Sequence, residues 1–231
     1  MKKIYLFITT IGIMLGASGC VNELDNYDAP NGGIKGRILD AETNEPIPLP
    51  VQGSTGTIIN LFELNTDATM SVDFYAKHDG SYEHAQVFNG DYNVVVNGPF
   101  VDSCEGNITI KGQTTFDLKA TPYTRINASA SASGTDVSIQ YNVVKTDNSY
   151  TVSEVYGYWN FAPGVDNGSA NYAGKVTVNE ISGTITFNLA NDSNYKNNLH
   201  KIKSNGNKIY VRIGAKTGSA INYSQIITVV I

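Results

Sequence analysis

Alternating apolar and polar residues run through most of the chain after residue 33. Alternation over about four to eight residues is typical of β-strands with one buried face. No segment in the first half has the period of an amphipathic helix. The strands predicted there cover residues 34–38, 57–64, 72–75, 82 onward, 92–96, 107–110 and 115–118. About seven short strands of this kind are expected to form a β-sandwich.

Turn residues separate these runs. Asp79-Gly80 and Asn89-Gly90 stand between alternating segments, where such pairs are strong signals of a β-hairpin. Residues 111–113, Lys-Gly-Gln, predict a final hairpin between the runs 107–110 and 115–118.

A second set of strands follows Pro122, which marks a boundary between two domains. The predicted strands cover residues 125–132, 137–144, 151–161, 173–178, 184–189, 208–215 and 223–230. Seven strands at this spacing suggest an immunoglobulin- or fibronectin-III-like sandwich, closed by a hairpin of the last two strands. Residues 191–205 form a polar connection, with one helical turn expected around 195–199. The predicted fold is all-β: two tandem β-sandwiches, at 34–120 and 123–231.

The first twenty residues have the order of a secretory signal peptide, placed at 1–19. A basic start precedes an apolar run over 4–15, which is too short for a permanent membrane span, and small residues follow at 16–19. Cys20 comes next, which indicates a bacterial lipoprotein that is cut before Cys20 and acylated on it. The alternative is an ordinary cleaved signal with an incidental cysteine. The lipoprotein interpretation predicts a protein outside the cytoplasm, held to a membrane by its lipid anchor.

Residues 20–33 are polar, acidic and rich in turn formers, with no strand or helix period. We interpret them as a lipid-anchored flexible tether. The alternative is that Leu24 and Tyr27 pack this segment on the first domain.

Charge and cysteine content narrow the choice of partners. The 231-residue chain has a formal net charge of −5 and no basic patch, which disfavours nucleic acid as a partner. Its two cysteines are Cys20 and Cys104, so acylation of Cys20 leaves no disulfide to form. Asp102 and Glu105 lie close to Cys104, and an inert or buried thiol is expected there.

The first domain carries a recognisable pattern. It reads Gly36-x-Ile38-x-Asp40-x-x-Thr43-Asn44-x-Pro46, followed by Asp79-Gly80-x-Tyr82 and Gly90-x-Tyr92-x-Val94-x-Val96. This resembles the carboxypeptidase-regulatory-like (transthyretin-like) β-sandwich over most of 34–120. That pattern normally has Gly where Asn44 stands, and Asn also adopts the left-handed conformation. The resemblance implies a fold and brings no peptidase residues with it.

The chain as a whole resembles a two-domain surface-lipoprotein family of Bacteroidetes, long labelled as of unknown function. Cys20 with its acidic tail, the stretch 24–30, the junction 121–123 and the two sandwiches carry the resemblance. Members typically sit beside SusC/SusD-type outer-membrane glycan-uptake pairs. The resemblance implies an outer-membrane, cell-surface lipoprotein accessory to polysaccharide capture. Its expected partners are the membrane, a polysaccharide or a SusC/SusD-type complex.

Few residues are candidates for catalysis. His78, His84 and His200 are the only histidines, and the spacing of the first two suits neither one helix face nor a zinc finger. No Gly-x-Ser-x-Gly, His-Glu-x-x-His, phosphate-binding glycine loop or EF-hand motif occurs. The sequence predicts a protein that is not an enzyme, with no metal site and no cofactor, and a glycosidase is the least favoured class. The second function class is a structural or adhesin-type stalk, whose last strand could pair with a partner.

The aromatic run 156–161 is the candidate for ligand binding. Strand alternation puts Trp159 on the core face and Tyr156 and Tyr158 on the outward face. Tyr172 or Tyr195 is expected beside the outward pair. Sugars stack on flat aromatic faces, so these four tyrosines are the predicted ligand-binding residues. Ordinary cross-strand packing is the alternative for the outward pair.

Overall fold

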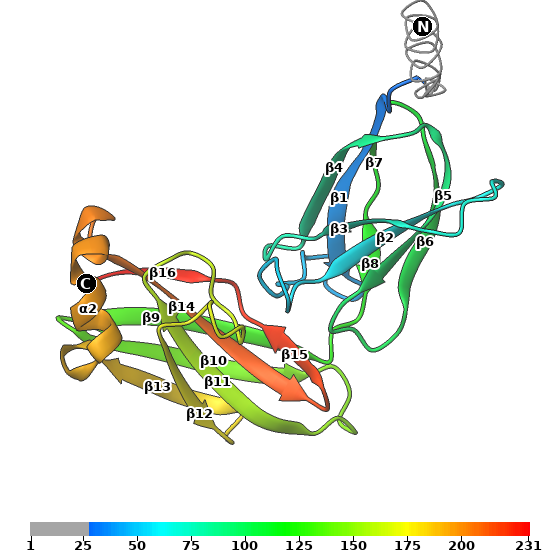
Figure 1. Cartoon of the computed structure of the whole chain (residues 1–231). Helices are drawn as coiled ribbons and strands as arrows, with labels where there is room; N and C mark the ends of the chain where they lie inside the picture. Colours follow the sequence, from blue (N-terminus) through cyan, green and yellow to red (C-terminus); the bar gives the residue numbers. More distant parts are fainter. Residues whose placement is uncertain (1–27) are drawn as a thin grey trace, which may run out of the picture.

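The computed structural model describes residues 28–231, so the predicted signal peptide, Cys20 and most of the predicted tether lie outside the described residues. Within that range the chain consists mainly of β-strands, arranged as two sandwiches (Figure 1). The predicted all-β fold is confirmed. None of the helices within residues 28–231 is long and apolar enough to cross a bilayer.

The first sandwich packs two four-stranded sheets face to face. In one, the central strand β1 (Gly32–Asp40) pairs with β4 (Ser81–Val87), β7 (Gln113–Thr115) and β8 (Leu118–Ala120). The other has the order β3 (Val72–Tyr75), β2 (Ile58–Glu63), β5 (Gly90–Asn97) and β6 (Cys104–Ile110), all antiparallel.

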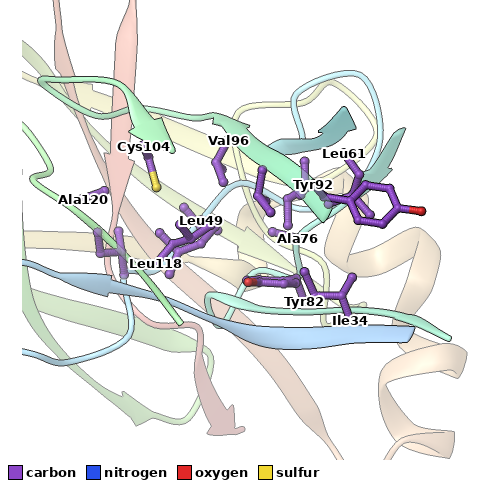
Figure 2. Close-up of a cluster of buried hydrophobic side chains, with 14 of the residues drawn as sticks. Ile34, Leu49, Leu61, Ala76, Tyr82, Tyr92, Val96, Cys104, Leu118 and Ala120 are labelled. Carbon is purple, nitrogen blue, oxygen red and sulfur yellow. The ribbon is translucent and has the colours of Figure 1, made fainter. Parts of the chain in front are cut away.

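Inward-facing apolar side chains of both sheets fill the space between them. Figure 2 shows Ile34 and Tyr82 from one sheet facing Leu61 and Val96 from the other, with Leu49 between the two layers. All five side chains are at most 4% exposed. Burying one such side chain contributes roughly 1.5–3 kcal/mol to folding, so this layer supplies the first sandwich with its own core.

Three turns predicted as hairpins connect strands of opposite sheets instead. β3 and β4, β4 and β5, and β6 and β7 each lie in different sheets, and β7 runs parallel to β1. The Asp79-Gly80 turn does form, with Gly80 at φ +84°. This turn connects one sheet to the other. Phe74 of β3 and Tyr82 of β4 face each other across the core, with ring centroids 6.2 Å apart. The hairpin prediction is therefore wrong at all three turns.

The second sandwich packs a three-stranded sheet on a larger one. The first has the order β13 (Ser182–Asn188), β10 (Asp136–Lys145) and β9 (Thr124–Ser133). The second has the order β12 (Gly174–Val178), β11 (Val152–Asn160), β14 (Lys208–Thr217) and β15 (Ala220–Tyr223). β16 (Ile227–Val230) also pairs with β14, so the predicted closing hairpin is present and the last strand completes its own sheet.

A short 3-10 turn, η1 (Leu189–Asn191), and the helix α2 (Ser193–Ser204) occupy the polar connection before β14. The helix has 12 residues and is longer than the single turn predicted. Asp192 caps it by accepting from the backbone N–H groups of Asn194 (2.7 Å) and Tyr195 (3.1 Å). Ile202 anchors the helix in the core. Asn and Ser are weak helix formers, so the cap and this tertiary contact explain a helix that the composition does not predict.

Arg212 of β14 forms the centre of a buried joint between the two sandwiches. The side chain is fully buried. Its guanidinium donates to the backbone carbonyls of Leu49 (2.8 Å), Val165 (3.0 Å) and Ser224 (2.8 Å). Burial lowers the pKa of Arg212 to about 10, so the group is still charged at neutral pH. Leu49 belongs to the first sandwich, and the cation therefore ties the two domains together.

Two further side chains of the second domain, Asp166 and Asn222, make polar contacts across the joint. Asp166, also fully buried, accepts from the Val51 N–H at 2.8 Å and from the Thr55 hydroxyl at 3.0 Å. The Asn222 side-chain amide donates to the Pro99 carbonyl at 2.9 Å. Buried polar groups stabilise a contact only when they are paired, and these pairs define one mutual placement of the domains.

An ion pair lies at the edge of the same joint. Arg125 of β9 makes a two-pronged contact with Asp40 of β1, at 2.6 Å and 2.8 Å, and its second prong also reaches Glu42 at 2.8 Å. Burial raises the pKa of Asp40. The Arg125 contact and the backbone N–H groups of Glu42 and Thr43 outweigh that effect, so the pKa of Asp40 lies below its ordinary value.

Candidate functional site

Tyr156 and Tyr158 of β11 do not point to solvent as the alternation predicts. Tyr156 is 5% exposed and Tyr158 is fully buried. Tyr172, from the connection after β11, and Tyr223 of β15 pack over them, with ring centroids 5.9 Å and 6.4 Å from that of Tyr158. Arg212 lies directly opposite Tyr158 on β14, so this side of the sheet faces the joint. The predicted exposure is wrong, and these two rings are not available as an open ligand surface.

Trp159 and Tyr195 belong to the other side of the same sheet. Trp159 is fully buried in the core of the second sandwich, as predicted, and its indole N–H donates to Asp192 at 3.2 Å. Tyr195 of α2 packs against that core. Of the four predicted ligand-binding tyrosines, the structure gathers Tyr156, Tyr158 and Tyr172 in one cluster and places Tyr195 elsewhere.

Cys104 and His84 pack against apolar side chains of the first sandwich. Cys104 is 1% exposed, and burial raises the pKa of its thiol to about 11, so it is the buried thiol predicted from the sequence. His84 packs its ring edge-on against Phe74 at 5.1 Å. Within residues 28–231, no three His, Cys, Asp or Glu side chains gather in a way that could hold a metal ion. Cys20, the predicted lipidation site, lies outside the described residues.

An open face of the first sandwich is the stronger candidate. The outward residues of the β3–β2–β5–β6 sheet are mostly polar, and we call them the asparagine face. Its members are Asp73 and Tyr75 of β3, Ile58, Asn60 and Phe62 of β2, Asp91, Asn93, Val95 and Asn97 of β5, and Glu105, Asn107 and Thr109 of β6.

Hydrogen bonds across the strands hold the polar side chains of this face in place. Asn97 donates to the Asn60 oxygen at 2.6 Å, and Asn60 donates to the Asp73 carboxylate at 2.6 Å. Farther along, Asn93 donates to the Asn107 oxygen at 2.8 Å. Each primary amide has two N–H donors and an oxygen with two lone pairs, so every member keeps hydrogen-bonding capacity beyond these contacts.

Two aromatic rings border the amides. Phe62 of β2 is 39% exposed and Tyr75 of β3 is 40% exposed. Phe62 lies opposite Asn93, and Tyr75 lies opposite Ile58. Residues 58 and 62 are four strand steps apart, or about 13 Å, so the two rings lie toward opposite ends of the face. Exposed aromatic side chains beside oriented polar groups are typical of ligand-binding surfaces.

The charge on this sheet has one sign. Its four strands contain Glu63, Asp73, Asp91 and Glu105 and no Lys or Arg. Hydrogen bonds from Ser71 and Asn60 lower the pKa of Asp73, so that carboxylate is ionised at neutral pH. The face therefore repels anionic ligands and offers hydrogen bonds to neutral polar ones.

Two family models match the chain over nearly all of the described residues. Residues 32–121 match the N-terminal domain of DUF3823, a protein family of unknown function, and residues 123–228 match the domain DUF3823_C. The chain belongs to the DUF3823 family. Comparison with curated protein sequences gives no match.

Crystal structures of DUF3823 proteins and of one further protein share the fold of the chain. A DUF3823 protein from Parabacteroides merdae has a TM-score of 0.72 at 19% identity, covering 87% of this chain and all of that one. A second, from Bacteroides ovatus, has a TM-score of 0.68 at 22% identity, covering 86% and 98%. A "putative carbohydrate binding protein" from Bacteroides uniformis has a TM-score of 0.64 at 19% identity, covering 87% and 100%. At these identities the likeness shows the fold alone.

A signal for the asparagine face is present in the sequence. Asn is depleted in β-strands, because its side chain competes with the backbone for hydrogen bonds. This DUF3823 protein nevertheless has four of them at outward positions of three neighbouring strands, at Asn60, Asn93, Asn97 and Asn107. This cluster of disfavoured residues on one outward face is the signal by which the sequence could have revealed it.

Proposed function

We propose that this DUF3823 protein is a non-catalytic glycan-binding lipoprotein of the bacterial cell surface, and that the asparagine face holds the glycan. The observation that carries the proposal is a solvent-exposed sheet face on which asparagine side chains hydrogen-bond across the strands. This face also carries two partly exposed aromatic rings, Phe62 and Tyr75. The fold shared with a "putative carbohydrate binding protein" supports it.

The chemistry of the face matches that of a neutral sugar. Sugar hydroxyls both donate and accept hydrogen bonds, as do the amides of Asn93 and Asn97. The C–H faces of a sugar ring pack on flat apolar rings such as Phe62 and Tyr75. The amides are already oriented by their mutual hydrogen bonds, so binding orders few side chains and loses little conformational entropy.

The same geometry supports binding without turnover. A glycosidase needs one carboxylic acid that is protonated at working pH, close to a second carboxylate. Asp73 does not suit the role of that acid, because hydrogen bonds from Ser71 and Asn60 lower its pKa and favour the ionised carboxylate.

The cellular setting rests on the N-terminal sequence and on the family resemblance. Acylation of Cys20 would place the protein in the outer membrane, beside a SusC/SusD-type uptake complex as an accessory to polysaccharide capture. Changing Cys20 to Ala is expected to move the protein from the membrane fraction to the soluble fraction. A variant that still sediments with membranes would contradict this part of the proposal.

Affinity electrophoresis tests the binding proposal. The mature chain without its lipid is run through gels that contain neutral polysaccharides, such as xylan, glucomannan and glucan, or acidic ones such as pectin. At least one neutral polysaccharide is expected to retard it, and pectin is not. Phe62→Ala is expected to lose the retardation at an unchanged melting temperature, while the matched surface change Val144→Ala on the other sandwich keeps it. Equal retardation of wild type and Phe62→Ala, or none in any gel, would refute the proposal.

A further inference from the structure

A hollow lies at each end of the asparagine face. At the start of β2 and the end of β5 lies a groove of about 540 Å³ between the two sandwiches. Asn97 and Thr55 line it from the first domain, and Asn167, Ser219 and Tyr223 line it from the second. At the other end lies a hollow of about 590 Å³, lined by Glu63, Asp91, Phe88 and Tyr92 among others.

The two hollows and the face form one continuous track. β2 runs from Ile58 at the groove to Glu63 at the far hollow, five strand steps or about 17 Å. β5 runs the opposite way, from Gly90 to Asn97. Asn97 belongs both to the asparagine face and to the groove, and Asp91 belongs both to that face and to the far hollow, so the face adjoins both.

The groove is preformed, because the joint fixes the domains that line it. Thr55 donates to the buried Asp166 of the second domain. Asn167 is held in turn by the Tyr158 hydroxyl at 3.1 Å and the Lys175 ammonium at 2.8 Å. A ligand that enters the groove therefore meets a fixed wall from each domain.

We infer that this DUF3823 protein binds an internal stretch of a linear neutral glycan, laid along β2 from the Phe88 hollow to the interdomain groove, and that the second domain supplies part of the site. The inference rests on the proposed function. A track open at both ends accepts a chain that continues beyond it, whereas an enclosed pocket selects a chain terminus. The acidic strands and the absence of Lys or Arg from them select against anionic glycans.

Isothermal titration with oligosaccharides of increasing length tests the inference. Linear gluco-, xylo- and manno-oligosaccharides from disaccharide to octasaccharide are titrated into the mature chain. For the glycan class that binds, affinity is expected to rise with length and then level off. The longest ligands should bind roughly tenfold or more tightly than the shortest, as one or two added hydrogen bonds would produce.

A groove-filling variant separates the domain contribution from binding on the face. Ser219 is exposed beside Gly218 in the β14–β15 turn, and Ser219→Arg places a long side chain in the groove. Ser133→Arg, beside Gly134 in the β9–β10 turn, is the matched control. Ser219→Arg is expected to bind short oligosaccharides with the affinity of the wild type. Its affinity should not increase for longer oligosaccharides, whereas the affinity of the Ser133→Arg control should.

The outcomes distinguish the two claims. The inference would be overturned if the affinity of Ser219→Arg rose with oligosaccharide length as much as that of the wild type. It would also be overturned if the wild-type affinity did not depend on oligosaccharide length. Either result would leave glycan binding on the face intact. No binding of any oligosaccharide or polysaccharide would refute the proposed function, and the inference with it.

Discussion

Neighbouring residues of β11 show what strand alternation can and cannot predict. Trp159 and Tyr158 lie on opposite faces, as the period requires, and Trp159 is in the core as predicted. Tyr158 is equally buried, because Tyr223 from a strand far along the chain and Tyr172 from the following connection cover it. Alternation predicts which side chains share a face, but the sequence does not show which later segment covers that face. The left-handed backbone conformation predicted for Asn44 is confirmed, since its φ is 60°.

Alanine variants of these two residues test the burial directly. Trp159→Ala and Tyr158→Ala are each expected to lower the free energy of unfolding by roughly 3–5 kcal/mol, as for other large aromatic core residues. The sequence alone predicts a small effect for Tyr158. Urea denaturation measures both, with the exposed Val144→Ala as the control. A Tyr158→Ala protein as stable as that control would show that the covering segment is not packed on β11.

At the scale of whole elements, the sequence predicts strands better than their partners. Most predicted strands are present within a few residues, because period and turn residues are local properties. The pairing is not local: β7 leaves β6 and joins β1 in the other sheet. The asparagine face was missed for a related reason, since its members come from four strands that only the sheet order brings together.

The helix α2 offers a test of an element that the composition does not predict. Asp192 both caps the helix and accepts the indole N–H of Trp159. Asp192→Ala is expected to cost about 1–3 kcal/mol of unfolding free energy through the lost cap and the unpaired indole. Asp192→Asn keeps a capping oxygen and is expected to cost less. Fluorescence of Trp159, the only tryptophan of the chain, follows the unfolding, and equal stability of all three proteins would contradict the assignment.

Over the whole molecule, the buried joint changes the expected behaviour of the two sandwiches. The sequence predicts two tandem sandwiches with Pro122 as the boundary between them, and nothing in it indicates that one depends on the other to fold. The structure places Arg212 and Asp166, both fully buried, in contacts that cross between them. The sequence could not show this, because an Arg in a strand is ordinarily a surface residue.

Calorimetry measures how strongly the joint couples the domains. The wild type is expected to melt in one transition. Arg212→Met removes the cation and leaves four backbone carbonyls, those of Leu49, His78, Val165 and Ser224, without this donor, at a cost of about 3–5 kcal/mol, as for other broken buried charge contacts. The variant is expected to melt in two separate steps. Two steps already in the wild type would mean that the joint does not couple the domains.

The ion pair between Asp40 and Arg125 makes the stability of the joint depend on pH. The folded-state pKa of Asp40 lies below its unfolded value, so its contribution to stability is present above the unfolded pKa of about 3.9. That contribution is lost as pH falls through the lower folded pKa. Melting temperatures of the wild type should therefore fall more steeply below about pH 4 than those of Asp40→Asn. Parallel profiles would contradict the pairing.

Glycan binding on the asparagine face is the central claim, and a pair of matched asparagine variants tests it most directly. Asn97→Ala removes the residue shared by the amide network and the groove, while Asn142→Ala removes an exposed asparagine from the outer face of β10 in the second sandwich. Isothermal titration of both variants uses the neutral oligosaccharide that the wild type binds. Asn97→Ala is expected to weaken binding about tenfold, the loss of one or two hydrogen bonds, and Asn142→Ala to leave it unchanged, both at wild-type melting temperature. Wild-type affinity in Asn97→Ala, or an equal loss in both variants, would show that the glycan is not held on this face.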